Sequence, residues 1–232
     1  MGNIIGREKE YVMISALIDK RKNIIIFGLE GVGKSAIIKS VLKEQNITNL
    51  LYSQDSRTLK SSLINLILSV LSNTKVIEEL NTLALKNSLY RIIKEKKPEY
   101  IVFDHVESVE PKFYSFFVYL MEAKIPIIVL SRGLEKKDIG HLRMSLFNFE
   151  KVEISNFDRT AADILIGHFI NEFDIKITKE ADFKKEIYHF SKGNPRIIKG
   201  LCFLARDVKY QKNEAIDVKL MDLDRRINEV VH

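Results

Sequence analysis

Residues 28–35 read Gly-Leu-Glu-Gly-Val-Gly-Lys-Ser, and they stand between an apolar run and a segment with helical spacing. Three glycines in this segment let the backbone turn tightly, so that several N–H groups can converge on one anion. The ammonium group of Lys34 can reach the β and γ phosphates of a nucleotide, and the hydroxyl of Ser35 can coordinate Mg²⁺. A strand before the turn and a helix after it would complete a phosphate-binding loop. A glycine-rich turn without a ligand is the alternative.

Up to about residue 155, short apolar runs alternate with longer segments whose apolar residues have helical spacing. The short runs are typical of buried strands, and the longer segments are typical of amphipathic helices. This alternation predicts right-handed crossovers and an α/β fold, a three-layer αβα sandwich with a parallel five-stranded sheet. The expected strands are 23–27, 50–52, 100–104 and 127–131 with a fifth at 152–154, and the expected helices are 7–20, 34–41, 59–71 and 77–93.

The pattern changes near Asn156. Asp158 is placed to start a helix and Thr178 to cap a second, while Pro195 suits the first position of a third. No strand pattern separates these helices. We therefore expect two domains, a nucleotide-binding α/β domain over residues 1–155 and a small helical lid over residues 156–232.

Polar residues follow two of the apolar runs, at the places where parallel strands would end. Asp104 closes one run, and Ser131 closes the next. Because the carboxyl ends of parallel strands line one edge of a sheet, both side chains are expected near the phosphate-binding loop. Asp104 would hold Mg²⁺ through water, with Ser35 as the other protein ligand of the metal. The alternative is that Asp104 only caps a turn.

Residues 4–10, Ile-Ile-Gly-Arg-Glu-Lys-Glu, and residues 191–196, Ser-Lys-Gly-Asn-Pro-Arg, carry a family resemblance. The first segment resembles the box that precedes the phosphate loop and lies over the adenine in the AAA+ ATPases and the related STAND ATPases, especially those of the origin-recognition and transposition-regulator type. The second resembles the lid signature at sensor 2 in these families. The resemblance covers nearly the whole chain and implies binding of ATP or ADP with Mg²⁺. The residues expected to bind the nucleotide are Ile4, Ile5, Arg7, Gly28, Glu30, Gly31, Val32, Gly33, Lys34, Ser35, Ala36, Pro195 and Arg196.

The resemblance implies roles for three further positions. Ser131 and Arg132 resemble sensor 1, although a serine at the end of a strand is common. Residues 141–147 resemble the stretch that carries an arginine finger, so that Arg143 would act on a neighbouring subunit; an exposed helix arginine is the alternative. Arg196 resembles the sensor 2 arginine. A cation is unfavourable in the first turn of a helix, and an anionic target would explain its position there.

One position departs from the family pattern. These ATPases usually have Glu directly after the strand-ending Asp, whereas this chain has His105, and the next acid is Glu107. Neutral imidazole can accept a proton, but its reach differs from that of Glu, and loss of a well-placed base commonly costs about 10²–10⁴-fold in rate. We therefore expect slow ATP hydrolysis, with Lys34, Asp104, His105, Ser131, Arg143 and Arg196 as the catalytic residues.

Composition excludes several classes of protein. With 46% hydrophobic and 29% charged residues, the chain can bury a core without disulfides or metals. Its one cysteine, Cys202, lies in an apolar stretch that predicts a buried, inert thiol. The histidines show no spacing suited to a metal site. Because no apolar run reaches membrane-spanning length, we expect a cytoplasmic protein without a membrane partner.

The sequence limits the choice of macromolecular partner less than it limits the choice of ligand. A formal net charge of +6 favours an acidic partner, but the lysines are dispersed, and a solvated basic surface explains the charge equally well. The resemblance implies a switch that assembles with itself or with related AAA+ subunits in a DNA-associated process, such as replication initiation or transposition. The alternative is a STAND-type signalling module with protein partners and no direct DNA contact. A small-molecule kinase with the same loop is a third class, and it leaves residues 193–196 unexplained.

Overall fold

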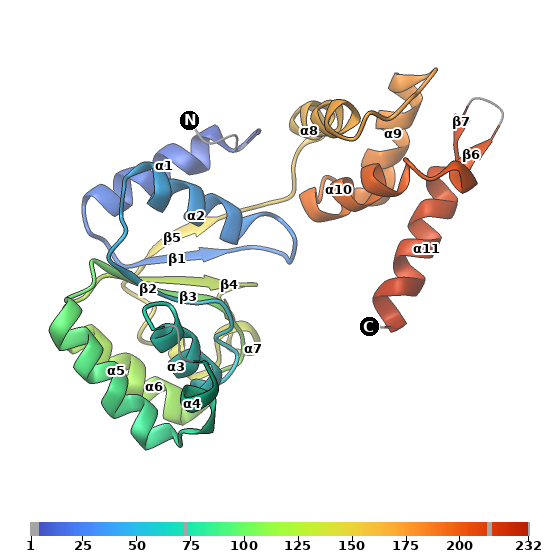
Figure 1. Cartoon of the computed structure of the whole chain (residues 1–232). Helices are drawn as coiled ribbons and strands as arrows, with labels where there is room; N and C mark the ends of the chain where they lie inside the picture. The colour runs from blue at the N-terminus through green and yellow to red at the C-terminus, as the bar shows by residue number, and fades with distance from the viewer. Residues whose placement is uncertain (1–4, 72–73, 213–214, 232) are drawn as a thin grey trace. The chain divides into compact units, whose positions relative to one another are not determined.

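The computed structural model describes residues 5–71, 74–212 and 215–231 and divides into two compact units, which are described separately (Figure 1). Of these residues, the first unit contains Lys9–Leu29 and Lys34–Ile154. The second unit contains residues 5–8, Glu30–Gly33 and residues 155–231. The ends of the glycine-rich loop therefore belong to the first unit, and its middle belongs to the second.

A parallel sheet of five strands forms the centre of the first unit: β1 (Ile24–Phe27), β2 (Leu50–Ser53), β3 (Tyr100–Val106), β4 (Ile127–Ser131) and β5 (Glu150–Glu153). The strand order is β2-β3-β4-β1-β5, and every neighbouring pair is parallel. Parallel neighbours require crossover connections, which the helices supply. The α/β fold with a five-stranded parallel sheet, expected from the sequence, is confirmed.

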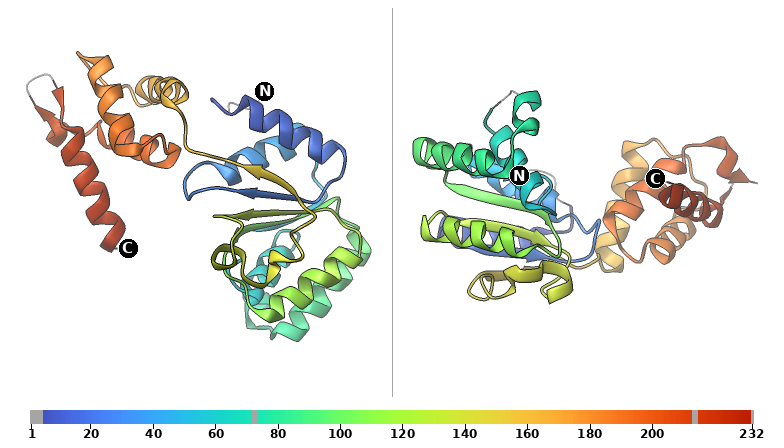
Figure 2. Two further views of the ribbon diagram at one scale, coloured as in Figure 1. Left: turned by 180° about the vertical axis from the view of Figure 1, so that it is seen from behind. Right: turned by 90° about the horizontal axis from the view of Figure 1, so that it is seen from below.

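Helices cover both faces of this sheet (Figures 1 and 2). The helices before β5 are α1 (Glu8–Asp19), α2 (Lys34–Glu44), α3 (Leu59–Leu68), α4 (Thr74–Glu79), α5 (Thr82–Lys96), α6 (Pro111–Glu122), α7 (Lys136–Ile139) and the 3₁₀ helix η1 (Gly140–Arg143). Helices α1 and α2 lie on one face, and α3, α5 and α6 lie on the other. Successive strand residues point to opposite faces, so Ile101 and Phe103 pack with Phe113 and Phe117 of α6. The buried side chains of α6, which are Phe113, Phe116, Phe117 and Leu120, therefore belong to the core.

The segment expected to form one helix at 77–93 forms two, α4 and α5. Asn81 stands between them in an extended conformation, and its side chain accepts a hydrogen bond from the main-chain N–H of Ala84. This cap satisfies a donor at the start of α5, so a new helix begins there. Apolar residues on both sides of the break, Ile77 and Leu85, are buried, which is why the spacing suggested a single helix.

The second unit is mainly helical, with α8 (Arg159–Glu172), α9 (Glu180–Ser191), α10 (Pro195–Leu204), the 3₁₀ helix η2 (Val208–Tyr210) and α11 (Val218–Val231). Asp158 caps α8, and Pro195 begins α10, as predicted. The N-cap of α9 is Lys179, one residue after Thr178, where the cap was expected. Helix α9 begins at Glu180, after Lys179, without a side-chain cap hydrogen bond. Acidic residues in its first turn complement the positive end of the helix instead.

The expectation that no strand interrupts these helices is wrong. Strand β6 (Gln211–Lys212) pairs antiparallel with β7 (Ala215–Ile216). Strands of this length are too short for an alternation of apolar and polar residues to reveal them.

Cys202 lies in the core of the second unit, together with Ile166, Ile187 and Ile198. Burial raises the pKa of its thiol to about 12, so the thiol stays protonated at neutral pH. Because the thiolate is the reactive form, the prediction of a buried, inert cysteine agrees with this position.

Gly193 connects α9 to α10 with a φ of 76°, and a Cβ atom there would lie 2.0 Å from the carbonyl oxygen of Phe157. We expect Gly193→Ala to lower the free energy of unfolding by about 3 kcal/mol or more, because backbone strain adds to a clash with backbone. Gly200→Ala is the matched control, since a Cβ there, inside α10, meets no atom within 4 Å. It should stabilise the protein by about 0.5–1 kcal/mol. Urea unfolding measures both variants, and equal stability of the two would contradict this packing.

Candidate functional site

The glycine-rich loop connects the end of β1 to the start of α2. Strand β1 ends at Phe27, and α2 begins at Lys34, so the strand and the helix predicted around the loop are both present. Gly31 and Gly33 have φ values of 80° and 101°, which residues with a Cβ rarely adopt. A Cβ at Gly33 would meet no atom within 4 Å, so this glycine serves the backbone conformation alone.

Lys34 folds back along the loop. Its Nζ donates hydrogen bonds to the carbonyl oxygens of Gly28, at 2.7 Å, and Leu29, at 2.9 Å. These bonds hold the positive charge beside the turn. Ser35 and Ala36 follow in the first turn of α2, where main-chain N–H groups have no partner within the helix. A helix start of this kind favours anions.

Strands β3 and β4 end beside the start of the loop. The main-chain N–H of Gly28 donates to the carbonyl oxygen of Ser131, the last residue of β4, at 3.3 Å. Ser131 is buried, and its hydroxyl donates to the carbonyl oxygen of Gly133 at 2.8 Å. In the register of the sheet, Ser131 pairs with Phe27 of β1 and with Val106 of β3. The carboxyl ends of three strands thus meet where the loop begins.

Asp104 is 4% exposed, and both of its carboxylate oxygens accept hydrogen bonds. The hydroxyl of Tyr52 donates to Oδ2 at 2.8 Å, and the main-chain N–H of His105 donates to Oδ1 at 2.8 Å. Burial, and then the negative charge of Asp104, raise the pKa of Tyr52, so its hydroxyl remains a donor. Tyr52 is not among the predicted site residues, because it ends an apolar run that is typical of a buried strand.

His105 has a φ of 54°, at an irregularity in β3 between Phe103 and Val106. Its side chain is 60% exposed, and its Nε2 lies 3.9 Å from Oδ1 of Asp104. Strand β3 therefore runs past Asp104 rather than ending there, and the next side chain is turned outward by the irregularity.

Arg143 ends the 3₁₀ helix η1, and its side chain is exposed. Two apolar residues that follow it, Met144 and Phe147, are 78% and 73% exposed. The stretch that the resemblance connects with an arginine finger thus lies at the surface of the first unit.

Arg7 is buried in the second unit, where it contacts the middle of the loop. It donates hydrogen bonds to the carbonyl oxygens of Val32, at 3.2 Å, and Ser155, and its guanidinium lies 4.0 Å from the ring centroid of Phe157. Through these contacts Arg7 helps to hold the conformation of the loop. Ile5 packs against the core of the second unit. Ile4, also expected at the adenine, lies outside the described residues.

Arg196 lies beside the same loop segment. Its Nη1 forms an ion pair with Oε1 of Glu30 at 2.7 Å, and its main-chain N–H donates to the carbonyl oxygen of Gly31 at 3.2 Å. The side chain of Asn194 donates to the carbonyl oxygen of Glu30 at 2.8 Å. A Cβ on Gly31 would lie 2.7 Å from Oδ1 of Asn194, so the glycine also permits this close approach. The start of α10, which begins at Pro195, and residues 30–33 therefore form one contact within the second unit.

The available donors suit Mg²⁺. Ser35 offers a hydroxyl and Asp104 a carboxylate, both hard oxygen ligands. Mg²⁺ is usually bound by one or two protein groups together with phosphates and water, so two such residues are enough. Among the described residues, no group of three His, Cys, Asp or Glu side chains could hold a metal ion.

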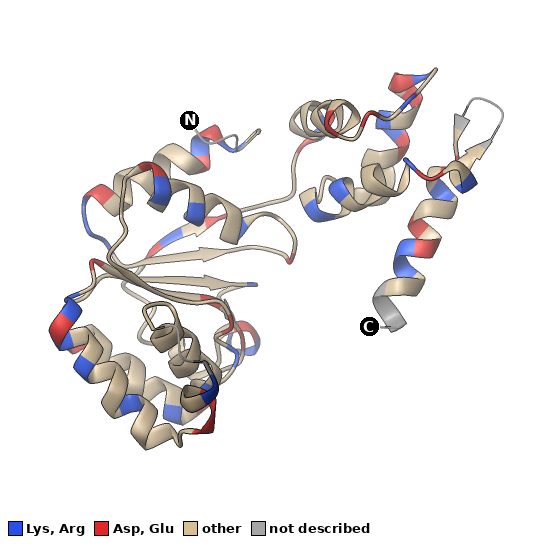
Figure 3. Cartoon of the chain, in the orientation of Figure 1, with Lys and Arg blue, Asp and Glu red and all other residues tan. Residues whose placement is uncertain are grey.

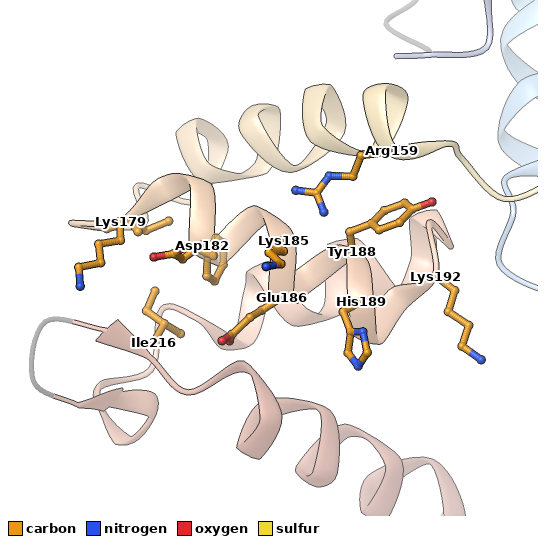
Figure 4. A pocket seen from close by; sticks show the side chains of 11 residues that line it. Arg159, Lys179, Asp182, Lys185, Glu186, Tyr188, His189, Lys192 and Ile216 are labelled. Carbon is orange, nitrogen blue, oxygen red and sulfur yellow. The ribbon is translucent and has the colours of Figure 1, made fainter.

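A cavity of about 870 Å³ lies along α9 in the second unit (Figure 4). Basic and acidic side chains alternate along it, and the residues predicted to bind nucleotide do not line it. Its charged residues are Arg159, Lys179, Asp182, Lys185, Glu186 and Lys192.

Lys and Arg residues occur on the helices of both units, interspersed with Asp and Glu (Figure 3). They are spread along the ribbon of the described residues and are not confined to one helix. Among these residues, no helix has both the length and the apolar character that a membrane span requires.

No family model matches the sequence, and no curated protein matches it. Solved structures resemble it over 99% of its length. A Walker-type ATPase of Pyrococcus abyssi has 14% sequence identity and a TM-score of 0.64. The structure of Drosophila ORC bound to DNA has 10% identity and a TM-score of 0.60, and Cdc6p from Pyrobaculum aerophilum has 11% identity and a TM-score of 0.60.

The chain spans 74%, 62% and 64%, respectively, of the lengths of those three chains. At these identities the likeness is one of fold. The chain has the fold of the AAA+ P-loop ATPases, as the sequence resemblance implied.

Proposed function

We propose that this chain, which has the AAA+ fold, binds ATP with Mg²⁺ in the loop 28–35 and works as a nucleotide-dependent switch. The turn from β1 into α2, with Lys34 held beside it, is the observation that carries this proposal. Main-chain N–H groups, one ammonium group and a helix start then act together on the phosphates. Ser35 and Asp104 would hold Mg²⁺, which supplies charge neutralisation to the phosphates when it is bound.

The switch would use both domains, residues 1–155 for the nucleotide and residues 156–232 as the lid. Arg196 would distinguish ATP from ADP. Its partner Glu30 is 58% exposed and Arg196 is 68% exposed, and ion pairs at the surface contribute only about 0–1 kcal/mol. A terminal phosphate could therefore replace Glu30 at small cost. If Arg196→Ala weakened the binding of ATP and ADP equally, this role would be wrong.

Isothermal titration calorimetry at millimolar Mg²⁺ tests the binding site. We expect the chain to bind ATP, and we expect Lys34→Ala to weaken binding by about 100-fold or more, because a charged partner of the phosphates is lost. Lys43→Ala is the matched control. Lys43 is an exposed lysine in the last turn of the same helix, so its removal should leave the affinity unchanged. Absence of heat from ATP, or equal effects of the two variants, would contradict the proposal.

The reaction would be slow, because His105 stands where the resemblance places a glutamate. We expect His105→Glu to raise the single-turnover rate of ATP hydrolysis by about 10²-fold, the lower end of what a well-placed base contributes. His105→Gln, which supplies no base, should not raise the rate. A rate for His105→Glu equal to or below that of the unmodified chain would remove the idea that this position limits hydrolysis.

We propose that the chain assembles with copies of itself or with related subunits. The exposed position of Arg143, which leaves its side chain accessible to a neighbour, supports this proposal. In this role Arg143 would contact the terminal phosphate in the adjacent site. Light scattering that finds a constant monomer in the apo, ADP and ATP-analogue states would leave Arg143 without the role.

The output we propose is DNA-associated. One of the three structural relatives named above is described as bound to DNA, and the formal net charge of this chain is +6. The dispersal of Lys and Arg along the ribbon favours the other candidate, a STAND-type regulatory module with protein partners and no direct DNA contact (Figure 3).

Fluorescence anisotropy with labelled DNA separates the two candidates. Binding through backbone phosphates should weaken steeply as salt rises, because counterions are released when basic side chains bind. The DNA-associated function predicts binding at low salt that falls by about tenfold or more between 50 and 200 mM salt. No binding at low salt, with or without ATP, would support the regulatory module.

A further inference from the structure

The hydroxyl of Tyr52 donates a hydrogen bond to Oδ2 of the Asp104 carboxylate at 2.8 Å. Tyr52 comes from β2, which pairs with β3 in parallel and places this residue opposite Val102. The hydroxyl therefore reaches toward the carboxyl end of the neighbouring strand, where Asp104 lies. Its ring is also in contact with α2, since Nζ of Lys39 lies 5.1 Å from the ring centroid.

The chain after Tyr52 holds the main chain of Asp104 as well. The N–H of Ser56 donates to the carbonyl oxygen of Asp104 at 2.9 Å. Ser56 is fully buried, and its hydroxyl donates to that of Ser53, also buried, at 2.9 Å. Ser53 in turn donates to the carbonyl oxygen of Asp55 at 2.9 Å. Residues 52–56 thus form a small hydrogen-bonded turn that holds both the side chain and the main chain of Asp104.

We propose that Tyr52 is a positioning residue for the magnesium site, where its hydroxyl fixes the orientation of the Asp104 carboxylate. This inference rests on the proposed function, in which Asp104 holds Mg²⁺. Each carboxylate oxygen has more than one lone pair, so the bonds from Tyr52 and from the N–H of His105 leave room for water bound to the metal. Together the two donors determine which lone pairs of the Asp104 carboxylate remain available to accept hydrogen bonds from water bound to the metal.

The physical reason lies in the burial of Asp104. A carboxylate that is 4% exposed cannot exchange a lost protein donor for bulk water, so removal of the Tyr52 hydroxyl would leave Oδ2 to turn toward another partner. Magnesium demands nearly ideal octahedral geometry and tolerates such a change poorly. Residues that orient a metal-binding carboxylate commonly contribute about 10–100-fold to metal affinity.

The test is a magnesium titration of nucleotide binding, followed with a fluorescent ATP analogue and the whole chain. We expect Tyr52→Phe to raise the Mg²⁺ concentration for half-maximal binding by about tenfold or more. Binding of the analogue in EDTA should change less than about twofold, because the loop 28–35 is untouched. If Tyr52 contributed only to packing, Tyr52→Phe would change nucleotide binding to the same extent with Mg²⁺ and in EDTA.

Tyr100→Phe is the matched control. Tyr100 is a buried tyrosine of the same unit whose hydroxyl donates to the carbonyl oxygen of Ile18 at 2.8 Å. It should leave the magnesium dependence unchanged, and thermal unfolding of both variants shows whether they are folded. Asp104→Asn distinguishes a failure of the inference about Tyr52 from a failure of the proposed magnesium site. A magnesium shift with Asp104→Asn but not with Tyr52→Phe would overturn the inference and leave the proposed function standing. No shift with either would overturn the inference and also the proposed role of Asp104 in holding Mg²⁺.

Discussion

The tight turn between β1 and α2, in which Gly31 and Gly33 have positive φ values, determines which residues of the first unit can act together on a ligand. Lys34 donates to the carbonyl oxygen of Gly28 because the chain turns back within a few residues after Phe27. The bond from the Gly28 N–H to Ser131 fixes where that reversal starts. A side chain at Gly33 would meet no neighbour, so the conformation of the backbone is the requirement there. Without this turn, the polar residues near the ends of β3 and β4 would not lie beside a phosphate-binding loop.

The carboxylate of Asp104 depends on a second constraint. A buried charge is costly unless hydrogen bonds satisfy it, and here Tyr52 and the N–H of His105 do so. The irregularity in β3 that gives His105 its positive φ also supplies this N–H. Strand β2 carries none of the motifs in the sequence. It nevertheless supplies the hydroxyl, because the order of the sheet places it next to β3.

The sequence predicted those elements whose signals are local. The five strands of the parallel sheet and the starts of α2 and α10 follow from apolar positions, from glycine-rich and proline positions, and from helical spacing. The break at Asn81 was missed because apolar spacing continues on both sides of it. The pair β6 and β7 was missed because its strands are too short to show a period.

The contacts of the site could be predicted only in part. Asp104, Ser131 and Lys34 stand at positions that the motifs identify, and the structure brings Ser131 to the start of the loop. Tyr52 could not be identified, because its use depends on which strand lies next to β3, and strand order is not a local property of the sequence. Arg7 was expected at the nucleotide, but its bond to Val32 joins residues far apart in the chain and could not be predicted. Arg196 was expected to face a phosphate, and here it pairs with Glu30.

Hydrogen–deuterium exchange of the whole chain, with and without ATP and Mg²⁺, tests the central claim most directly, because it reports on individual segments of the backbone. If main-chain N–H groups of residues 28–35 bind the phosphates, exchange in this segment should slow when both ATP and Mg²⁺ are added. Unchanged exchange at 28–35, or protection confined to residues along the α9 cavity, would contradict the account.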